Sequence, residues 1–211
     1  MQAQYLSVLQ HADKPSTDRI LGSASTVLMG YQLGGKIPPS ALAWASYRRF
    51  SRDLGRQSFP SVHLVMYDPE AWHKTPIDEQ QHPVVFMERF ARLARRYGFQ
   101  VMLTPNPNLM TVSGGDCVAG TGETLVHAYV RCGISGSAAR VADVVETQAQ
   151  ALESSPAAYR AFVEQTAAQA DAANPHVKVI RARDHTGCSG DVFGVGLGSR
   201  HRGRVLPIRW K

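Results

Sequence analysis

The chain has 211 residues, of which 44% are apolar, enough to bury the core of one ordinary domain, and it contains no apolar run long enough to cross a membrane. The formal charge of +6 is concentrated, because residues 181–211 hold seven basic and two acidic residues while residues 1–180 hold 16 and 15. The main body therefore lacks the basic face that phosphate binding requires, which argues against a nucleic-acid partner. The first residues also lack the basic and apolar regions of a secretory signal.

The N-terminal half predicts two strands separated by a helix. Residues 26–31 are a short apolar run bounded by serine and glycine, which is typical of a buried strand in a parallel sheet. Ser40 is placed to cap a helix over residues 41–54, whose apolar side chains fall mainly on one side, and Gly55 is placed to end it. A second strand over residues 62–67 leads into a polar loop.

The rest of the chain continues the alternation of strands and helices. Pro83 opens a helix that Gly98 ends. The later stretches predict, in order, a strand over 100–104, a Gly-rich loop over 113–122, helical turns over 123–132 and 137–141, a strand over 143–148, a helix capped by Ser155 and ended by Asn174, and a strand over 177–180.

The pattern of elements predicts the fold class. Strand and helix alternate without a hairpin signal, which indicates parallel strands joined by right-handed crossovers. A doubly wound sheet would carry a G-x-G-x-x-G phosphate turn after its first strand, and Tyr31-Gln-Leu-Gly-Gly35 does not match that turn. Polar residues gather where the strands finish, as they do in barrels. We therefore expect an α/β fold, a partial (β/α)8 TIM-like barrel of about five parallel βα units.

The carboxyl end departs from this pattern after residue 180, where a Gly-rich and Arg-rich stretch replaces the expected helix. A complete barrel needs about 250 residues, so about three strand–helix units are missing. Either the natural reading frame was lost near residue 181 or the segment is a genuine basic tail. The predicted organisation is an N-terminal extension over 1–25, an incomplete barrel domain over 26–180 and an irregular basic tail over 181–211.

Several short segments carry a resemblance to a known family. They are Met29-Gly-Tyr31, Lys36-Ile-Pro-Pro-Ser40 with Trp44, Met66-Tyr-Asp-Pro-Glu-Ala-Trp72 with Thr75-Pro76 and Glu79-Gln80, Leu103-Thr-Pro105, and Val145-Glu-Thr-Gln-Ala-Gln150. In these segments the chain resembles an uncharacterised family of bacterial glycosidase-like (β/α)8 barrel proteins, many of them exported. The resemblance implies a complete barrel and chemistry on sugars, and the chain departs from it by ending after the fifth predicted strand.

Carboxylates at the predicted strand ends are the candidate catalytic groups. Asp68 and Glu70 form a D-x-E pair whose side chains point the same way along an extended backbone. Glycoside hydrolases need two carboxyl groups, about 5–5.5 Å apart for retention or roughly 6.5–9.5 Å for inversion. We assign Glu70 as general acid, Asp68 as orienter or electrostatic stabiliser, and Glu146 at the fourth strand as the partner carboxylate. The alternatives are that Asp68 caps the following turn, that Glu70 is solvated or pairs with an arginine, and that Glu146 is a buried, hydrogen-bonded strut.

Aromatic and amide side chains near the same strand ends are the candidate substrate-binding groups. The aromatic residues are Tyr31, Tyr67 and Trp72, which could stack on a sugar ring or could instead fill the core. The amides are Asn106, Gln148 and Gln150, which could hydrogen-bond sugar hydroxyls.

The cysteines and histidines do not predict a metal site, and the sequence predicts no cofactor. Cys117, Cys132 and Cys188 lack the spacing of metal ligands. The separation of Cys117 and Cys132 suits a disulfide if the protein is exported, and two free thiols in a reducing cytosol are the alternative.

Three functions remain open from the sequence. The first is an enzyme that performs general acid–base chemistry on a glycosidic bond. The second is a non-catalytic module that binds carbohydrate or another surface. The third is an inactive gene fragment. The sequence does not fix the substrate, the cellular location or the oligomeric state.

Overall fold

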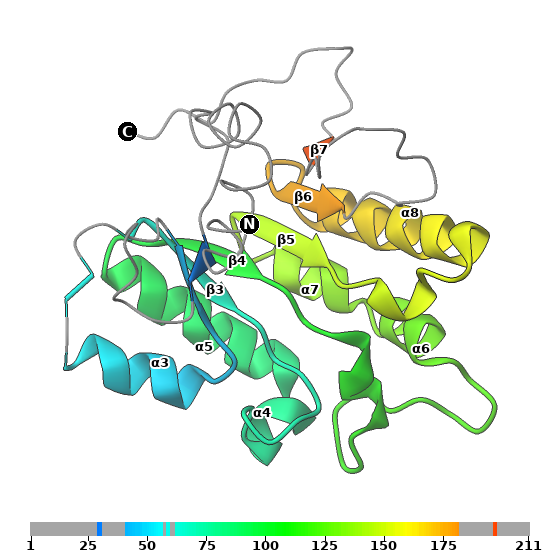
Figure 1. Ribbon diagram of the computed structural model, residues 1–211, viewed down its shortest axis with the longest axis horizontal. Coiled ribbons are helices and arrows are strands. Elements are labelled where there is room, and N and C mark those ends of the chain that lie inside the picture. The colour runs from blue at the N-terminus through cyan, green and yellow to red at the C-terminus, as the bar shows by residue number, and fades with distance from the viewer. Residues whose placement is uncertain (1–28, 31–40, 57, 60–61, 182–195, 198–211) are drawn as a thin grey trace, which may run out of the picture.

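The computed structural model describes residues 29–30, 41–56, 58–59, 62–181 and 196–197, which form a mixed α/β structure around one sheet (Figure 1). Its strands are β1 (Met29–Gly30), β2 (Ala41–Trp44), β3 (Leu64–Tyr67), β4 (Gln100–Leu103), β5 (Val144–Thr147), β6 (Lys178–Arg181) and β7 (Gly196–Leu197). They follow one another in the sheet in the order of the chain. All pairs from β1 to β6 are parallel, and β7 pairs antiparallel with β6. The predicted parallel α/β fold is therefore confirmed for the described residues.

The helices follow the strands in the same order. They are α3 (Tyr47–Leu54), α4 (Ile77–Gln81), α5 (Pro83–Arg96), α6 (Leu125–Arg131), α7 (Ile134–Ala139) and α8 (Pro156–Ala173), with two 3-10 turns, η2 (Pro107–Thr111) and η3 (Gln150–Leu152). Helix α3 packs against α5, α5 against α7, and α7 against α8 (Figure 1). A doubly wound sheet reverses its strand order at a switch point, and the described strands show no such reversal.

The two faces of the sheet carry different cores, because successive side chains of a strand point to opposite sides. In β3, Val65 and Tyr67 belong to the large apolar cluster that includes the helices, whereas Leu64 and Met66 belong to a small cluster on the other face. The small cluster is completed by Ala41, Ala43 and Met102. A strand that is apolar on both faces is the usual signature of a buried parallel sheet, and it explains why these strands read as continuous apolar runs.

The predicted helix over residues 41–54 is wrong in its first part. Ala41–Trp44 form strand β2, paired with β3 along its whole length, and α3 begins only at Tyr47. Its N-cap is Ser46, whose hydroxyl accepts a hydrogen bond from the Arg49 N–H at 3.2 Å. The segment is rich in alanine and so has helix propensity, but all four of its residues are buried and strand pairing prevails. Ser40, the predicted cap, lies outside the described residues.

The other predicted elements agree with the structure within a few residues. The helix from Pro83 is α5, and Gly98 follows it with a positive φ of 79°, which favours glycine. The strands at 62–67, 100–104, 143–148 and 177–180 are β3 to β6. Helix α4 lies in the stretch predicted as a loop, and α7 begins three residues earlier than the predicted turn at 137–141. The predicted extension over 1–25 and most of the predicted tail lie outside the described residues.

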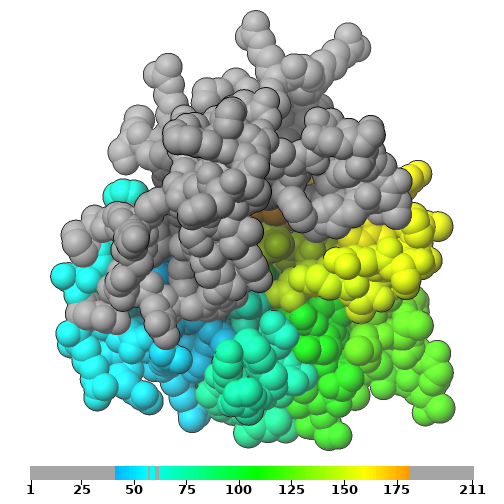
Figure 2. Space-filling view, in the orientation of Figure 1, coloured from blue at the N-terminus to red at the C-terminus, as the bar shows by residue number. Residues whose placement is uncertain are grey.

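The loops after β3 and β4 lie side by side at the edge where these strands end, in teal and green at the lower edge of the molecule (Figure 2). The Asn106 N–H donates to the carbonyl of Pro69 at 3.1 Å, and the Ala71 N–H donates to Oδ1 of Asn108 at 2.9 Å. Further along the chain, the Asp116 N–H donates to the carbonyl of Gln81, the last residue of α4, at 2.8 Å. The polar strand-end residues are thus held on loops that brace each other.

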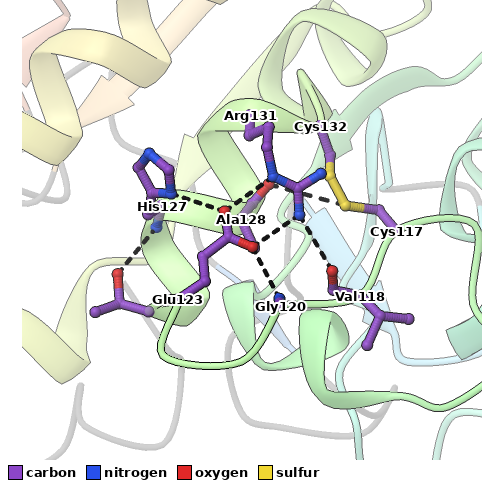
Figure 3. A network of polar contacts seen from close by, with 9 residues as sticks. Cys117, Val118, Gly120, Glu123, His127, Ala128, Arg131 and Cys132 are labelled. Carbon is purple, nitrogen blue, oxygen red and sulfur yellow. Dashed lines mark hydrogen bonds and ion pairs between the residues drawn. A yellow bond between two sulfur atoms is a disulfide. The ribbon is translucent and has the colours of Figure 1, made fainter.

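A disulfide joins Cys117, in the Gly-rich loop, to Cys132 at the end of α6 (Figure 3). Beside it, the Arg131 guanidinium donates to both carboxylate oxygens of Glu123 at 2.8 Å and to the carbonyl of Val118 at 3.1 Å. Of the two alternatives that the sequence leaves open for these cysteines, the structure contains the paired form. The covalent link and the bidentate ion pair together fasten the loop to α6.

Candidate functional site

Asp68 is the centre of a polar cluster at the carboxyl ends of three neighbouring strands. It follows β3 directly and is 8% exposed. Its Oδ1 accepts hydrogen bonds from Oγ1 of Thr104 at 2.9 Å and from Nε2 of Gln148 at 2.6 Å. Thr104 follows β4 directly, and Gln148 follows β5 directly. Because parallel strands end at one edge of a sheet, residues 36 and 80 positions away from Asp68 in the sequence reach the same carboxylate.

A chain of amides holds Gln148 in a single orientation. Nδ2 of Asn106 donates to Oε1 of Gln148 at 2.5 Å, and Nε2 of Gln148 donates to the Thr104 carbonyl at 2.8 Å as well as to Asp68. Oδ1 of Asn106 in turn accepts from the Asn108 N–H at 2.9 Å. Both ends of the Gln148 amide are therefore engaged, and its nitrogen must face Asp68 because that nitrogen meets two acceptors.

Glu146 lies on the same face of the sheet as Gln148, because the two are separated by one residue in an extended strand. Its side chain is half-buried. Burial raises its pKa to about 7, and the negative charge of Asp68 adds to the increase. The pKa of Asp68 is also raised by burial, although the hydrogen bonds from Thr104 and Gln148 oppose the change. The two carboxyl groups are therefore electrostatically coupled.

Glu70 lies two residues beyond Asp68, on the loop that precedes α4, and is half-buried. Its pKa is raised first by burial and then by the charge of Asp68, while a hydrogen bond with Asn108 and the charge of Lys74 oppose the change. The Glu70 N–H donates to Oγ1 of Thr75 at 3.2 Å. The charge of Asp68 thus raises the pKa of both other acidic residues predicted from the sequence, Glu70 and Glu146.

Trp72 is half-buried on the same loop, and Thr75 fixes it there. Nε1 of Trp72 donates to Oγ1 of Thr75 at 3.0 Å, and that hydroxyl donates to the Ala45 carbonyl at 2.9 Å. Nζ of Lys74 lies 4.5 Å from the centroid of the Trp72 ring. One face of the ring is therefore occupied by a cation, and a sugar stacking on that face would have to displace it.

Tyr67 and Gln150 are not part of this polar cluster. Tyr67 has no exposed surface and points to the helix face of the sheet, where its ring stacks on Phe90 with centroids 5.0 Å apart. It therefore fills the core, which was the alternative stated for the aromatic residues, and offers no stacking surface at the strand ends. Gln150 is exposed in η3, and Tyr31 lies outside the described residues.

A second buried carboxylate, Glu79 on α4, was not predicted as a functional or structural residue. It has no exposed surface, and it accepts hydrogen bonds from four donors. These donors are the Ser46 hydroxyl at 3.0 Å, the N–H groups of Tyr47 at 2.7 Å and Arg48 at 3.1 Å, and the Tyr67 hydroxyl at 2.8 Å. The first N–H groups of a helix lack partners within the helix, and a carboxylate is well suited to them. Glu79 therefore joins α4, the start of α3 and β3.

Sequence reasoning also missed Thr104, Asn108 and Thr75. Thr104 could have been found by the rule that identified Asp68, because it too is the first polar residue after a strand. Asn108 and Thr75 act through the loop backbone, and no spacing in the sequence marks them.

Within the described residues, no three His, Cys, Asp or Glu side chains are grouped so that they could hold a metal ion. None of the helices in that part of the chain is long and apolar enough to span a membrane. Comparison with protein-family models, curated proteins and solved structures found no match to this chain. The resemblance to a glycosidase-like family therefore stays a prediction, and a function has to be argued from the site.

Proposed function

We propose that the polar cluster at the ends of β3, β4 and β5 is the active site of a glycoside hydrolase-like enzyme. The observation that supports this proposal is the grouping of Asp68, Glu70 and Glu146 at one edge of the sheet, with Asp68 held by Thr104 and Gln148. Glycosidic bonds are cleaved by two carboxyl groups of which one is protonated and one is ionised. Environments that separate the pKa values of neighbouring carboxyl groups are the means by which enzymes assign these roles.

We assign the acid role to Glu146 in place of Glu70. A group with a pKa of about 7 is protonated in a large fraction of molecules up to neutral pH and can deliver that proton to the glycosidic oxygen. Asp68 then acts as the ionised partner, either taking a proton from the attacking water or attacking the anomeric carbon itself. Glu70 stays a candidate acid because its pKa is raised as well.

The sheet register supports a sugar-sized gap between Asp68 and Glu146. Tyr67 pairs with Leu103, and Leu103 pairs with Val145. The residues that follow them, Asp68, Thr104 and Glu146, therefore lie at the same level across the three strands. Two strand spacings separate the backbones of Asp68 and Glu146 by about 10 Å. Side chains on one face can close this distance to the range used by glycosidases.

The wider architecture supports the same proposal. The strands follow one another in sequential order, and each of β2 to β5 is followed by a helix. This is the arrangement of (β/α)8 barrels, in which active sites lie at the carboxyl ends of the strands. We propose that the described sheet is part of such a barrel and that the chain is related to the glycosidase-like family that it resembles.

A non-catalytic carbohydrate-binding module is the second candidate. The observation that favours it is Trp72, a half-buried indole on the loop after β3, whose Nε1 is held by the Thr75 hydroxyl. Such a module would bind sugars without cleaving them.

The test is the release of reducing ends from a panel of soluble polysaccharides and fluorogenic glycosides. We expect Glu146→Gln and Asp68→Asn each to lower kcat by about 100-fold or more, which is the usual contribution of a general acid or base. Glu70→Gln should have a smaller effect, and Glu164→Gln, on the exposed side of α8, should have none. Full activity in folded Glu146→Gln and Asp68→Asn would refute the proposal. Binding without hydrolysis by the wild-type protein would favour the module.

A further inference from the structure

We infer that Gln148 is a positioning residue, which holds Asp68 in place as the ionised member of the carboxylate pair and so leaves the transferable proton on Glu146. This inference rests on the proposed function for its catalytic meaning. It does not depend on it for its test, because the ionisation of Asp68 can be measured without a substrate.

The contacts of Gln148 are those of a rigid donor. Its Nε2 donates to Asp68 at 2.6 Å and to the carbonyl of Thr104 at 2.8 Å, while its Oε1 accepts from Asn106 at 2.5 Å. If the amide turned over, its oxygen would face the Asp68 carboxylate and the Thr104 carbonyl, which cannot donate a hydrogen bond to it. It would also lose the hydrogen bond from Asn106. Gln148 therefore offers Asp68 a hydrogen and never a lone pair.

Such a donor favours the charged form of Asp68. A carboxylate accepts hydrogen bonds more strongly than a carboxylic acid does, so a fixed donor lowers the pKa of the group that it contacts. Within the described residues, both hydrogen bonds to the Asp68 carboxylate end on Oδ1.

Asp68 shares the cluster with other charged groups, and its own charge is opposed by burial. Among the described residues, Glu70 from its own loop and Glu146 from β5 are the acidic groups that influence the cluster, and Lys74 is the cation that acts on Glu70. Thr104, directly after β4, is neutral and supplies the only other hydrogen bond to the Asp68 carboxylate among the described residues. Burial alone disfavours the Asp68 charge, and one donor fewer would move the proton from Glu146 toward Asp68.

The first experiment is a carbon-13 NMR titration of the side-chain carboxyl groups in the full chain, with Asp68→Asn and Glu146→Gln used to assign the signals. In Gln148→Met we expect the titration midpoint of Asp68 to rise by about one to two pH units, the range for a hydrogen bond to a charged group. The midpoint of Glu146 should fall by less. Gln165→Met, on the exposed side of α8, is the matched control and should change neither midpoint.

A second variant guards against a Gln148→Met protein that does not fold. Asn106→Ala leaves Gln148 in place but frees its oxygen, so the Asp68 midpoint should rise in the same direction by a smaller amount. An Asp68 midpoint that stays at its wild-type value in a folded variant, Gln148→Met or Asn106→Ala, would overturn the inference.

Activity separates this inference from the proposed function. If a substrate is found, Gln148→Met should move the acidic limb of the kcat/KM profile to higher pH by the amount that NMR records, because that limb reports the ionisation of the base in the free enzyme. A variant that loses rate with an unmoved profile would overturn the positioning role and leave the hydrolase proposal standing. A shifted NMR midpoint in a protein that cleaves no glycoside would refute the proposed function alone.

Discussion

Replacing Glu79 by alanine is the sharpest test of how this fold is held together. The substitution removes the acceptor of four hydrogen bonds at a site with no solvent exposure. A buried donor that loses its partner costs about 1–3 kcal/mol. Arg48 lies at the surface, so water can reach part of the start of α3 and recover some of this loss. We therefore expect Glu79→Ala to lower the free energy of unfolding by about 4 kcal/mol.

The neighbouring residue supplies a matched control. Asp78 lies on the same helix and makes an exposed ion pair with Arg48 at 2.6 Å, so Asp78→Ala should cost less than about 1 kcal/mol. Tyr67→Phe removes a single donor of the Glu79 cluster and should cost about 1 kcal/mol. Urea unfolding followed by far-UV circular dichroism measures all three. Equal stability of the Glu79→Ala and Asp78→Ala proteins would refute the reasoning.

Three further predictions concern the disulfide and two carboxylates. Replacing both Cys117 and Cys132 by serine should lower the free energy of unfolding by about 3 kcal/mol, and reductant should then no longer lower the melting temperature; continued sensitivity to reductant would contradict this. Glu146 binds its proton more tightly in the folded chain, so its contribution to stability is fully present below its ordinary pKa of 4.5 and is lost as the pH rises to about 7. Glu146→Gln should flatten that dependence in thermal melts at several pH values, and an unchanged slope would count against it. The Arg131 guanidinium, above all, holds the pKa of Glu123 well below its usual range, so the contribution of Glu123 is present above pH 4.5 and is lost as the pH falls further. Hydrogen exchange should show α6 opening more readily in Glu123→Ala, most clearly above that pH.

Much of the sheet could be predicted from the sequence because its strands are apolar on both faces. The apolar runs of β3 and β4 are short and are followed by turn residues. Their length and these turn residues identify them as strands. Strand β2 was missed because Ala41–Trp44 is too rich in alanine to read as a strand. Its conformation is decided by β3, which lies 20 residues further along the chain and pairs with it at every position.

The search for polar residues at the predicted strand ends identified the centre of the candidate site but not all of the residues around it. It brought together Asp68, Asn106 and Gln148 because parallel strands deliver their last residues to one edge. Tyr67 could have been excluded by the same reasoning, because it precedes Asp68 and successive side chains of a strand point to opposite faces of the sheet. Glu79 carries no comparable signal. Its partners are 12 to 33 residues away, and only the packing of α4 against α3 and β3 brings them to it.

The junction of Tyr67 and Asp68 links the helix layer to the chemistry of the opposite face. These two residues are adjacent in the chain. The Tyr67 hydroxyl donates to Glu79, and the Asp68 carboxylate accepts from Thr104 and Gln148. A substitution that lets the aromatic ring drift would therefore rotate the acid next to it. A survey of random substitutions would rank Glu79 among the residues most sensitive for stability, because its buried side chain joins three elements of the fold.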